Sequence, residues 1–269
     1  VQTREMMKKK VYHSQSKIDD TYLPLLGSKH VKRYHLMPFD EYIKYGKNLA
    51  APRDPKIYQG ARILINRIVS QDTIHGVFLE ETFINNTDIF NLLPLPQANI
   101  SLKVLYALIV SKLCATYFKN KNINLSRKTF PKINVNTLEK FPVPVITDEI
   151  QNKIETLVDS LIYINGQIYT KKQIFIELLQ ENLGVTKVSK KLDSFFEYNF
   201  KIFVEELKKK TINLSLSDQA EWKNFFNEYK KTINTFQKQF ALIDQNINKI
   251  IYRLYDLTDE GIKIVNGEA

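Results

Sequence analysis

The stretch that decides the fold of the second half is DQAEWKNFFNEYKKTINTFQKQFALIDQNINKIIYRL, residues 218–254. Its large apolar residues recur at alternating steps of four and three, at Trp222, Phe226, Tyr229, Ile233, Phe236, Phe240, Ile243, Ile247, Ile250 and Leu254. This heptad spacing predicts one long helix with an apolar seam along one face, which needs a partner to cover it. Asp218 and Glu221 have the spacing of a capping box and predict where the helix begins.

Working toward the N-terminus, residues 150–168 repeat the same pattern and supply the expected partner. Their apolar positions are Ile150, Ile154, Leu157, Leu161, Ile164 and Ile168. Thr147-Asp148-Glu149, with acids in the first turn, favours a helix start just before them. We expect the two seams to pair within one chain as a coiled-coil-like helix pair, with a dimeric coiled coil as the alternative. A further amphipathic helix is predicted over 192–207, and Pro142 and Pro144 mark a domain boundary near residue 146.

The first half has a different pattern, with short apolar segments separated by Gly and Pro. Strands are predicted over 61–69, 76–80 and 89–93, and a helix over 101–118 with Ser101 as its N-cap. Residues 1–20 are polar and read as a flexible lead-in. The predicted fold class is α+β, with a mixed α/β domain over residues 21–146 followed by an all-α, coiled-coil-like helical domain over 147–269.

Charge divides the chain in the same place. The formal net charge is +10, of which residues 1–145 contribute +11 and residues 146–269 contribute −1, and all four His lie in the first half. This asymmetry predicts that the first half faces a polyanion. Cys114 is the only cysteine, so no internal disulfide forms, and no membrane span or secretory signal is recognised. We therefore expect a cytoplasmic protein, and Val1 at the start suggests a piece of a longer or processed chain.

Signatures of catalysis are missing from the sequence. We find no Gly-rich phosphate loop, no paired C-x-x-C, no G-x-S-x-G and no Asn-Pro-Pro-aromatic motif of an amino-methyltransferase. Asp40 with Asp54-Pro55-Lys56 loosely fits the spacing of a metal nuclease, but Pro55 suits the required strand badly. Scattered His with one Cys disfavour zinc. The chain is predicted to be non-catalytic, with no metal site.

Six segments of the first half together resemble a known family. They are LLGSKHVKRY (25–34), YIKY (42–45), GARILINRI (60–68), LYALIVSKL (105–113), TFPKI (129–133) and FPVP (141–144). In order and spacing they resemble the TaqI-like C-terminal specificity domain of adenine-specific DNA methyltransferases. The family's helix carries Asn-Ser where this chain has Val110-Ser111. The second half, with its ending INKIIYRLYDLTDEGIKI (247–264), is similar to the C-terminal helical part of fused type IIG restriction–modification enzymes.

The resemblance implies a target-recognition domain that reads a sequence in double-stranded DNA. It implies partnership with a methyltransferase domain or subunit, which would hold S-adenosylmethionine and lie outside this chain, so no cofactor is expected here. A phage-exclusion methyltransferase or a type I specificity subunit are alternatives, although a type I subunit would carry two tandem recognition domains and only one is seen. A helical adaptor with a nonspecific basic surface is the alternative from another class.

Candidate DNA contacts are the cations and amides of the basic half, because phosphates hold the register and base edges give the identity. They are Arg33, Lys44, Lys47, Arg53, Arg62 and Arg67, together with the loop residues Lys119, Lys121, Asn122, Asn124, Arg127 and Lys128. The alternative for each is a solvated charged face. Arg62 and Arg67 sit among apolar neighbours, so either also fits a buried ion pair. The neutral second half is interpreted as a spacer whose Phe-rich stripes and Trp222 form core.

Overall fold

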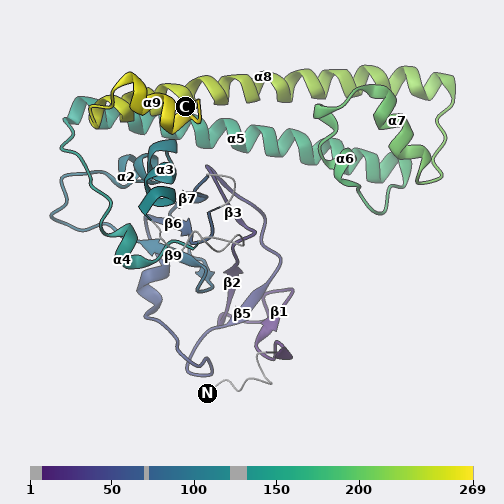
Figure 1. Ribbon diagram of the computed structural model, residues 1–269. Coiled ribbons are helices and arrows are strands. Elements are labelled where there is room, and N and C mark those ends of the chain that lie inside the picture. Colours follow the sequence, from purple (N-terminus) through teal and green to yellow (C-terminus); the bar gives the residue numbers. More distant parts are fainter. Residues whose placement is uncertain (1–7, 70–72, 122–131, 269) are drawn as a thin grey trace. The chain divides into compact units, whose positions relative to one another are not determined.

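The computed structural model describes residues 8–69, 73–121 and 132–268, and its contacts group the chain into two compact units. The first unit takes in residues up to 158 together with those from 246 onward, and the second takes in residues 159–245 (Figure 1). The division falls inside the two longest helices and not at the predicted boundary after residue 146. The predicted domain limits of 21–146 and 147–269 therefore stay a prediction, and each unit is described by itself.

Short strands form a mixed four-stranded sheet in the first unit. Its order is β1-β5-β2-β8, made of His13–Ser14, Tyr42–Lys44, Tyr22–Leu26 and Ile84–Asn85. The β1–β5 and β2–β5 pairs are antiparallel, and β2 and β8 are parallel. A small hairpin of β3 (Val31–Lys32) and β4 (His35–Leu36) follows β2 along the chain.

The second sheet of the first unit is antiparallel and has the order β7-β6-β9. Its strands are β6 (Arg62–Asn66), β7 (Gly76–Leu79) and β9 (Ile89–Leu92), which confirms all three predicted strands within shorter bounds. Every residue of the central strand β6 is buried. Leu64 packs in a cluster with β7 and β9 residues, and this interior fixes the positions of the connections at both sheet ends.

The helix predicted over 101–118 is in fact two helices, α2 (Leu102–Ile109) and α3 (Lys112–Lys121). Ser111 lies at the break: its hydroxyl donates to the Leu108 carbonyl at 2.7 Å and accepts from the Cys114 amide at 3.1 Å. A serine that caps the next turn competes with the helical backbone bonds, which explains why the apolar periodicity continues through a break. Ser101 is the N-cap of α2, as predicted.

The remaining elements of the first unit are short, apart from the ends of the long helices. They are η1 (Pro55–Tyr58), α4 (Val135–Leu138) and α9 (Asp259–Asn266). Contacts join α3 to α9, so the C-terminal end of the chain packs within the first unit. Gly267 ends α9 at φ 73°, a left-handed conformation that glycine adopts without steric cost.

Two long helices, α5 (Asp148–Leu183) and α8 (Leu216–Leu254), each contribute to both units. The start of α8 corrects the predicted capping box by three residues. The Ser215 hydroxyl accepts from the Asp218 amide at 3.1 Å, and the Asp218 carboxylate accepts from the Ser215 amide at 3.1 Å. Serine at the N-cap with an acid three residues later is the usual chemistry of this motif, and it replaces the predicted pair of Asp218 and Glu221.

The core of the second unit is aromatic. Phe175 of α5 stacks on Phe195 with ring centroids 3.7 Å apart, and Phe203 and Phe226 pack in the same cluster. The helix predicted over 192–207 is broken into α6 (Lys190–Asp193), η3 (Phe195–Glu197) and α7 (Phe200–Lys208). Asn199 caps α7 by accepting from the Ile202 amide at 3.0 Å, which restarts the helix there.

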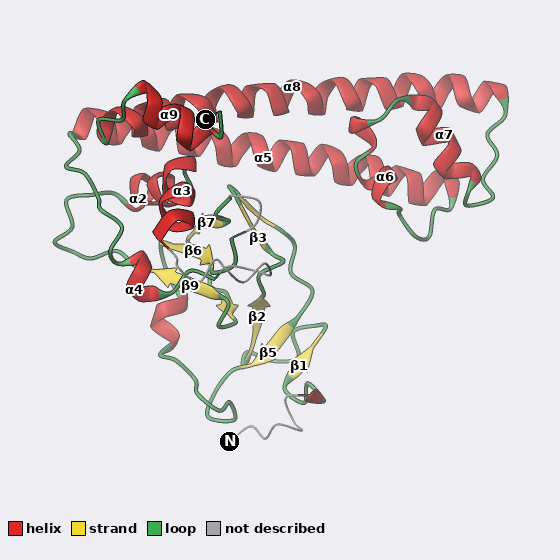
Figure 2. Cartoon of the chain, viewed as in Figure 1, coloured by secondary structure: helices red, strands yellow, loops and turns green. Residues whose placement is uncertain are grey.

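Along the chain, the short strands β1–β9 precede the long helices α5 and α8. This order of strands and helices confirms the predicted α+β class (Figure 2). Within the second unit, one apolar cluster contains Phe226 and Ile233 of the predicted α8 seam, and Ile168, the last residue of the predicted α5 seam, packs against it. The coiled-coil description of the whole pair stays a prediction.

Candidate nucleic-acid interface

One end of the β7-β6-β9 sheet gathers connections from four parts of the first unit. At the last residue of β6, the Asn66 amide donates to the His75 carbonyl at 2.8 Å, and its side-chain amide donates to the Ser28 carbonyl at 3.1 Å. Just beyond it, Ile68 forms a bridge with Lys132. The cationic and imidazole side chains of this end, which we call the basic rim, are Lys32, Arg33, Arg67, His75 and Lys132.

Arg67 is held rigidly at the rim. Its Nε donates to the Ile133 carbonyl at 3.3 Å, its Nη1 donates to the Thr87 carbonyl at 3.1 Å, and the guanidinium lies 5.0 Å from the centre of the Phe90 ring. Within the described residues, no carboxylate pairs with it. A guanidinium fixed on one side by carbonyls and a ring presents a preorganised donor for an anion.

Arg33 is held in a similar way in the turn between β3 and β4. Its Nε donates to the Val110 carbonyl at the end of α2, 2.9 Å away, and its guanidinium lies 5.0 Å from the centre of the Tyr34 ring. Desolvation, then the charges of Lys32 and Arg33, lower the pKa of His75. Lys32 and Arg33 thus place two positive charges close to His75, as a contact with a phosphate requires. Lys32, His75 and Lys132 were not among the predicted contacts.

The loop predicted to read bases starts and returns in this unit. It leaves α3 beyond the exposed Lys119 and rejoins the described chain at Lys132, whose ammonium pairs with Asp88 at 2.9 Å. Its return therefore lies at the basic rim. The side chain of Lys121 and the four residues Asn122, Asn124, Arg127 and Lys128 lie outside what the structure describes, so these contacts stay predictions.

Arg62 is at the other end of β6 and is 0% exposed. Its Nη1 donates to the Gly60 carbonyl at 3.0 Å and its Nη2 to the Phe83 carbonyl at 3.4 Å, while its buried Nε has no partner among the described residues. Burial lowers the pKa of the guanidinium, and Glu81 partly opposes that shift. A side chain in this position cannot reach a duplex, so we remove Arg62 from the candidate contacts and assign it a structural role, with carbonyl partners where an ion pair was the alternative.

Lys44, Lys47 and Arg53 belong to the other sheet and its following loop. All three side chains are exposed, Lys44 at the end of β5 and the others in the turns before η1. The Tyr45 hydroxyl donates to the Arg53 carbonyl and fixes that part of the loop. Unlike Arg62, these three residues are not excluded by burial, and their contact with DNA stays a prediction.

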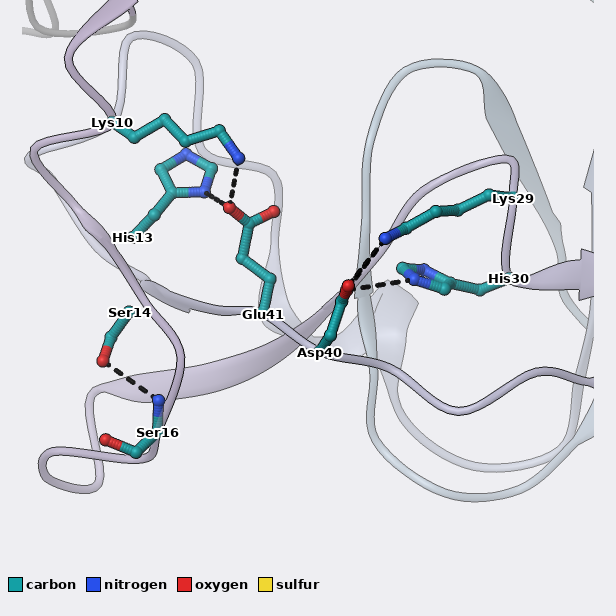
Figure 3. Close-up of polar contacts among 8 residues, drawn as sticks. All are labelled: Lys10, His13, Ser14, Ser16, Lys29, His30, Asp40 and Glu41. Carbon is teal, nitrogen blue, oxygen red and sulfur yellow. Dashed lines mark hydrogen bonds and ion pairs between the residues drawn. The ribbon is translucent and has the colours of Figure 1, made fainter. Parts of the chain in front are cut away.

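Two clusters around neighbouring carboxylates were not anticipated from the sequence (Figure 3). Glu41 Oε1 is 2.5 Å from the Lys10 ammonium and 3.0 Å from His13 Nδ1. Asp40 is 2.8 Å from the Lys29 ammonium and 3.4 Å from His30 Nε2. These contacts neutralise both acids beside the β2–β3 turn.

His30 has a defined tautomer in this arrangement. Its Nδ1 accepts from the Gly27 amide at 2.9 Å, so the proton of the neutral ring is on Nε2, which faces Asp40. Desolvation lowers the pKa of His30, and the charge of Lys29 adds to that effect. The neutral imidazole of His30 thus stabilises the turn between β2 and β3 by accepting from the Gly27 amide.

The nuclease spacing considered above is not realised as a strand. Pro55 begins the short helix η1, and Asp54 is its N-cap, accepting from the Lys56 amide at 2.9 Å. Across the described residues, no three His, Cys, Asp or Glu side chains gather in a way that could hold a metal ion. None of the described helices combines the length and the apolar character that crossing a membrane demands. The Cys114 thiol is buried, and burial raises its pKa.

Comparison with known families divides the chain as its charge does. The TaqI-like C-terminal specificity domain matches residues 23–143, which confirms the resemblance drawn from the six segments. A domain of unknown function, DUF8810, matches residues 147–251. No curated protein gives a significant match.

Proposed function

We propose that this chain is the sequence-specific, double-stranded DNA recognition module of a type II restriction–modification adenine methyltransferase or methyltransferase–endonuclease, and that it carries out no chemistry itself. The observation that carries the proposal is the match of residues 23–143 to the TaqI-like C-terminal specificity domain. The net charge of +11 over residues 1–145 supports it independently, since duplex DNA is the polyanion such a domain reads.

The basic rim would supply the contacts that set the register. Arg33 and Arg67 are already fixed by backbone carbonyls, so little side-chain entropy is lost when they meet a phosphate. The amides and cations predicted in loop 119–128 would contact base edges. The described chain resumes after this loop at Lys132, which bridges Ile68 at the basic rim. Lys44, Lys47 and Arg53 would add phosphate contacts.

A methyltransferase domain or subunit is the proposed partner, and it would bring the S-adenosylmethionine site and the catalytic motif. The helical half, matched by a domain of unknown function, would act as a spacer that holds the recognition domain in register with that partner. A role in defence against foreign DNA follows from this assignment.

Selection from a randomised duplex pool tests the proposal. The chain is bound at several salt concentrations between about 50 and 200 mM, and the retained duplexes are sequenced. We expect a steep loss of binding with salt together with one enriched short motif. Salt-dependent retention without enrichment would reject sequence reading by this chain, and no retention at low salt would favour the helical adaptor.

A further inference from the structure

The half of the chain that is neutral overall contains a local excess of positive charge. Within the second unit, α7 and α8 enclose an open hollow of about 670 Å³. Four lysines line it against a single acid, Glu205, and we call this surface the lysine groove. The lysines are Lys201 and Lys208 from α7 and Lys223 and Lys230 from α8.

The spacing of these lysines is regular. On each helix the two are seven residues apart, which is nearly two turns, so both lie on one face about 10 Å apart along the axis. Asn199, Gln219 and Asn227 also line the groove and add amide groups, while Phe200 and Phe226 contribute apolar surface. Two rows of ammonium groups thus face a common space.

These charges are not cancelled by neighbours. Lys201, Lys208 and Lys223 are exposed, and no salt bridge to any of them occurs among the described residues. Lys230 donates to the Tyr198 carbonyl, which orients it without neutralising it. The nearby acid Glu206 is committed elsewhere, to Lys209 at 2.6 Å and to the Ser189 hydroxyl at 2.7 Å.

We propose that the lysine groove binds the phosphate backbone of duplex DNA, independently of base sequence. The inference rests on the proposed function, which makes DNA the polyanion that this chain meets. Among the residues that the structure describes, no arginine lines the groove. Lysine acts as a point charge on phosphate and lacks the planar fork that pairs with guanine. The groove is therefore suited to binding the DNA backbone without recognising the base sequence. The second half then contributes to DNA affinity and is more than a spacer.

The test is the salt dependence of duplex binding by the full chain. The groove variant carries Lys201→Gln, Lys208→Gln and Lys223→Gln, and leaves Lys230 in place because of its backbone contact. The matched control carries Lys190→Gln, Lys231→Gln and Lys238→Gln, which removes the same charge from exposed positions of the same unit outside the groove. Circular dichroism and the urea midpoint check that both variants fold.

Removing one lysine that binds a phosphate should reduce the slope of log K against log salt by about 0.9 on B-form DNA. We expect the slope of the groove variant to fall by about 2.7 if all three lysines bind phosphates, and that of the control to fall by less than about 0.9. Equal slopes of log K against log salt for the two variants would overturn the proposal. An acidic protein would then be the expected partner of the groove.

The motif enriched by the wild-type chain separates this inference from the proposed function. A motif that is enriched equally by the wild-type chain and the groove variant, with a reduced slope only in the latter, supports both. An enriched motif together with equal salt slopes for the groove variant and the control variant rejects DNA binding by the groove and leaves the proposed function standing. A reduced slope without any enrichment rejects sequence reading and keeps the groove.

Discussion

The two compact units are stabilised by different chemistry. The interior of the first contains the buried polar side chains of Arg62, Asn66 and His30. Arg62 and Asn66 donate to the backbone of distant segments, at Phe83 and Ser28, and His30 accepts from the Gly27 amide within its own turn. The second packs one aromatic cluster around Phe175, with Phe195 and Phe203 among its members. Buried polar groups bonded to specific partners fix one arrangement of turns, whereas aromatic packing chiefly supplies stability.

This difference bears on function. A surface that reads a sequence needs its loops held in one place, and the first unit holds them with directed hydrogen bonds. A surface that only grips phosphates tolerates more movement, and Lys201, Lys208 and Lys223 of the lysine groove project from helices with no salt bridge to a carboxylate among the described residues.

Removing the Phe175 ring from the aromatic cluster of the second unit should cause the largest loss in the free energy of unfolding. Phe175 is 0% exposed, and Phe175→Ala should lower the free energy of unfolding by about 3–5 kcal/mol, because it loses buried area and leaves a cavity. Urea unfolding followed by Trp222 fluorescence reports on this unit. Leu242→Ala, at a side chain 62% exposed, is the control and should change little. Equal effects of the two substitutions would refute the aromatic core.

Arg62→Met tests the polar interior of the first unit. It leaves the carbonyls of Gly60 and Phe83 without their donor, and we expect a loss of about 1–3 kcal/mol in the free energy of unfolding. The salt slope of DNA binding should be unchanged in folded protein. A fall of the slope by a full phosphate contact would place Arg62 on the DNA surface against its burial.

Tyr106→Phe removes one hydroxyl that joins three segments. That hydroxyl donates to the Gly76 carbonyl at 2.9 Å and accepts from the Tyr34 amide at 2.9 Å, next to the basic rim. We expect a loss of about 0.5–1.5 kcal/mol, measured by urea unfolding. Tyr163→Phe, at a side chain 65% exposed, is the matched control. If both substitutions are neutral, the bridge contributes nothing to stability.

Mild acid, from about pH 7.5 to about pH 6.0, should weaken only the first unit. Desolvation lowers the pKa values of His30, His35 and His75, so the unfolded chain binds protons at higher pH than the folded chain does. The stability they contribute is present above the unfolded pKa of about 6.5 and falls as the pH drops from there through the folded values. At about pH 6.0, protonation at each of these three histidines should lower the free energy of unfolding by at most about 0.8 kcal/mol.

Hydrogen exchange of β6 amides, compared with Trp222 fluorescence during urea unfolding, separates the two units at about pH 7.5 and about pH 6.0. The second unit contains no histidine and serves as the internal control. Loss of stability in that unit alone would contradict the assignment.

Much of the fold was predictable because periodicity is local. The strands β6, β7 and β9 and the start of α2 follow from apolar alternation and from Ser101. The break at Ser111 was missed because apolar spacing continues across it, and only the hydroxyl contacts of its side chain reveal it. The cap at Ser215 was missed because the next acid also has capping-box spacing.

The site was less predictable because it depends on contacts between distant segments. Burial of Arg62 and exposure of Lys44 are set by tertiary packing and not by residue type. The rim joins Arg33 to Val110 and Arg67 to Ile133, partners 77 and 66 residues away, which no local pattern shows. Net charge summed over half the chain concealed the lysine groove, since acids elsewhere in that half balance it.

We propose that the first half of the chain reads bases and that the helical half grips only the DNA backbone. Pool selection on the groove variant and on a loop variant, with Asn122→Ala, Asn124→Ala, Arg127→Ala and Lys128→Ala, tests it directly. The account predicts the wild-type motif, bound more weakly, from the groove variant, and a changed or absent motif from the loop variant. A motif changed by the groove variant and kept by the loop variant would contradict it.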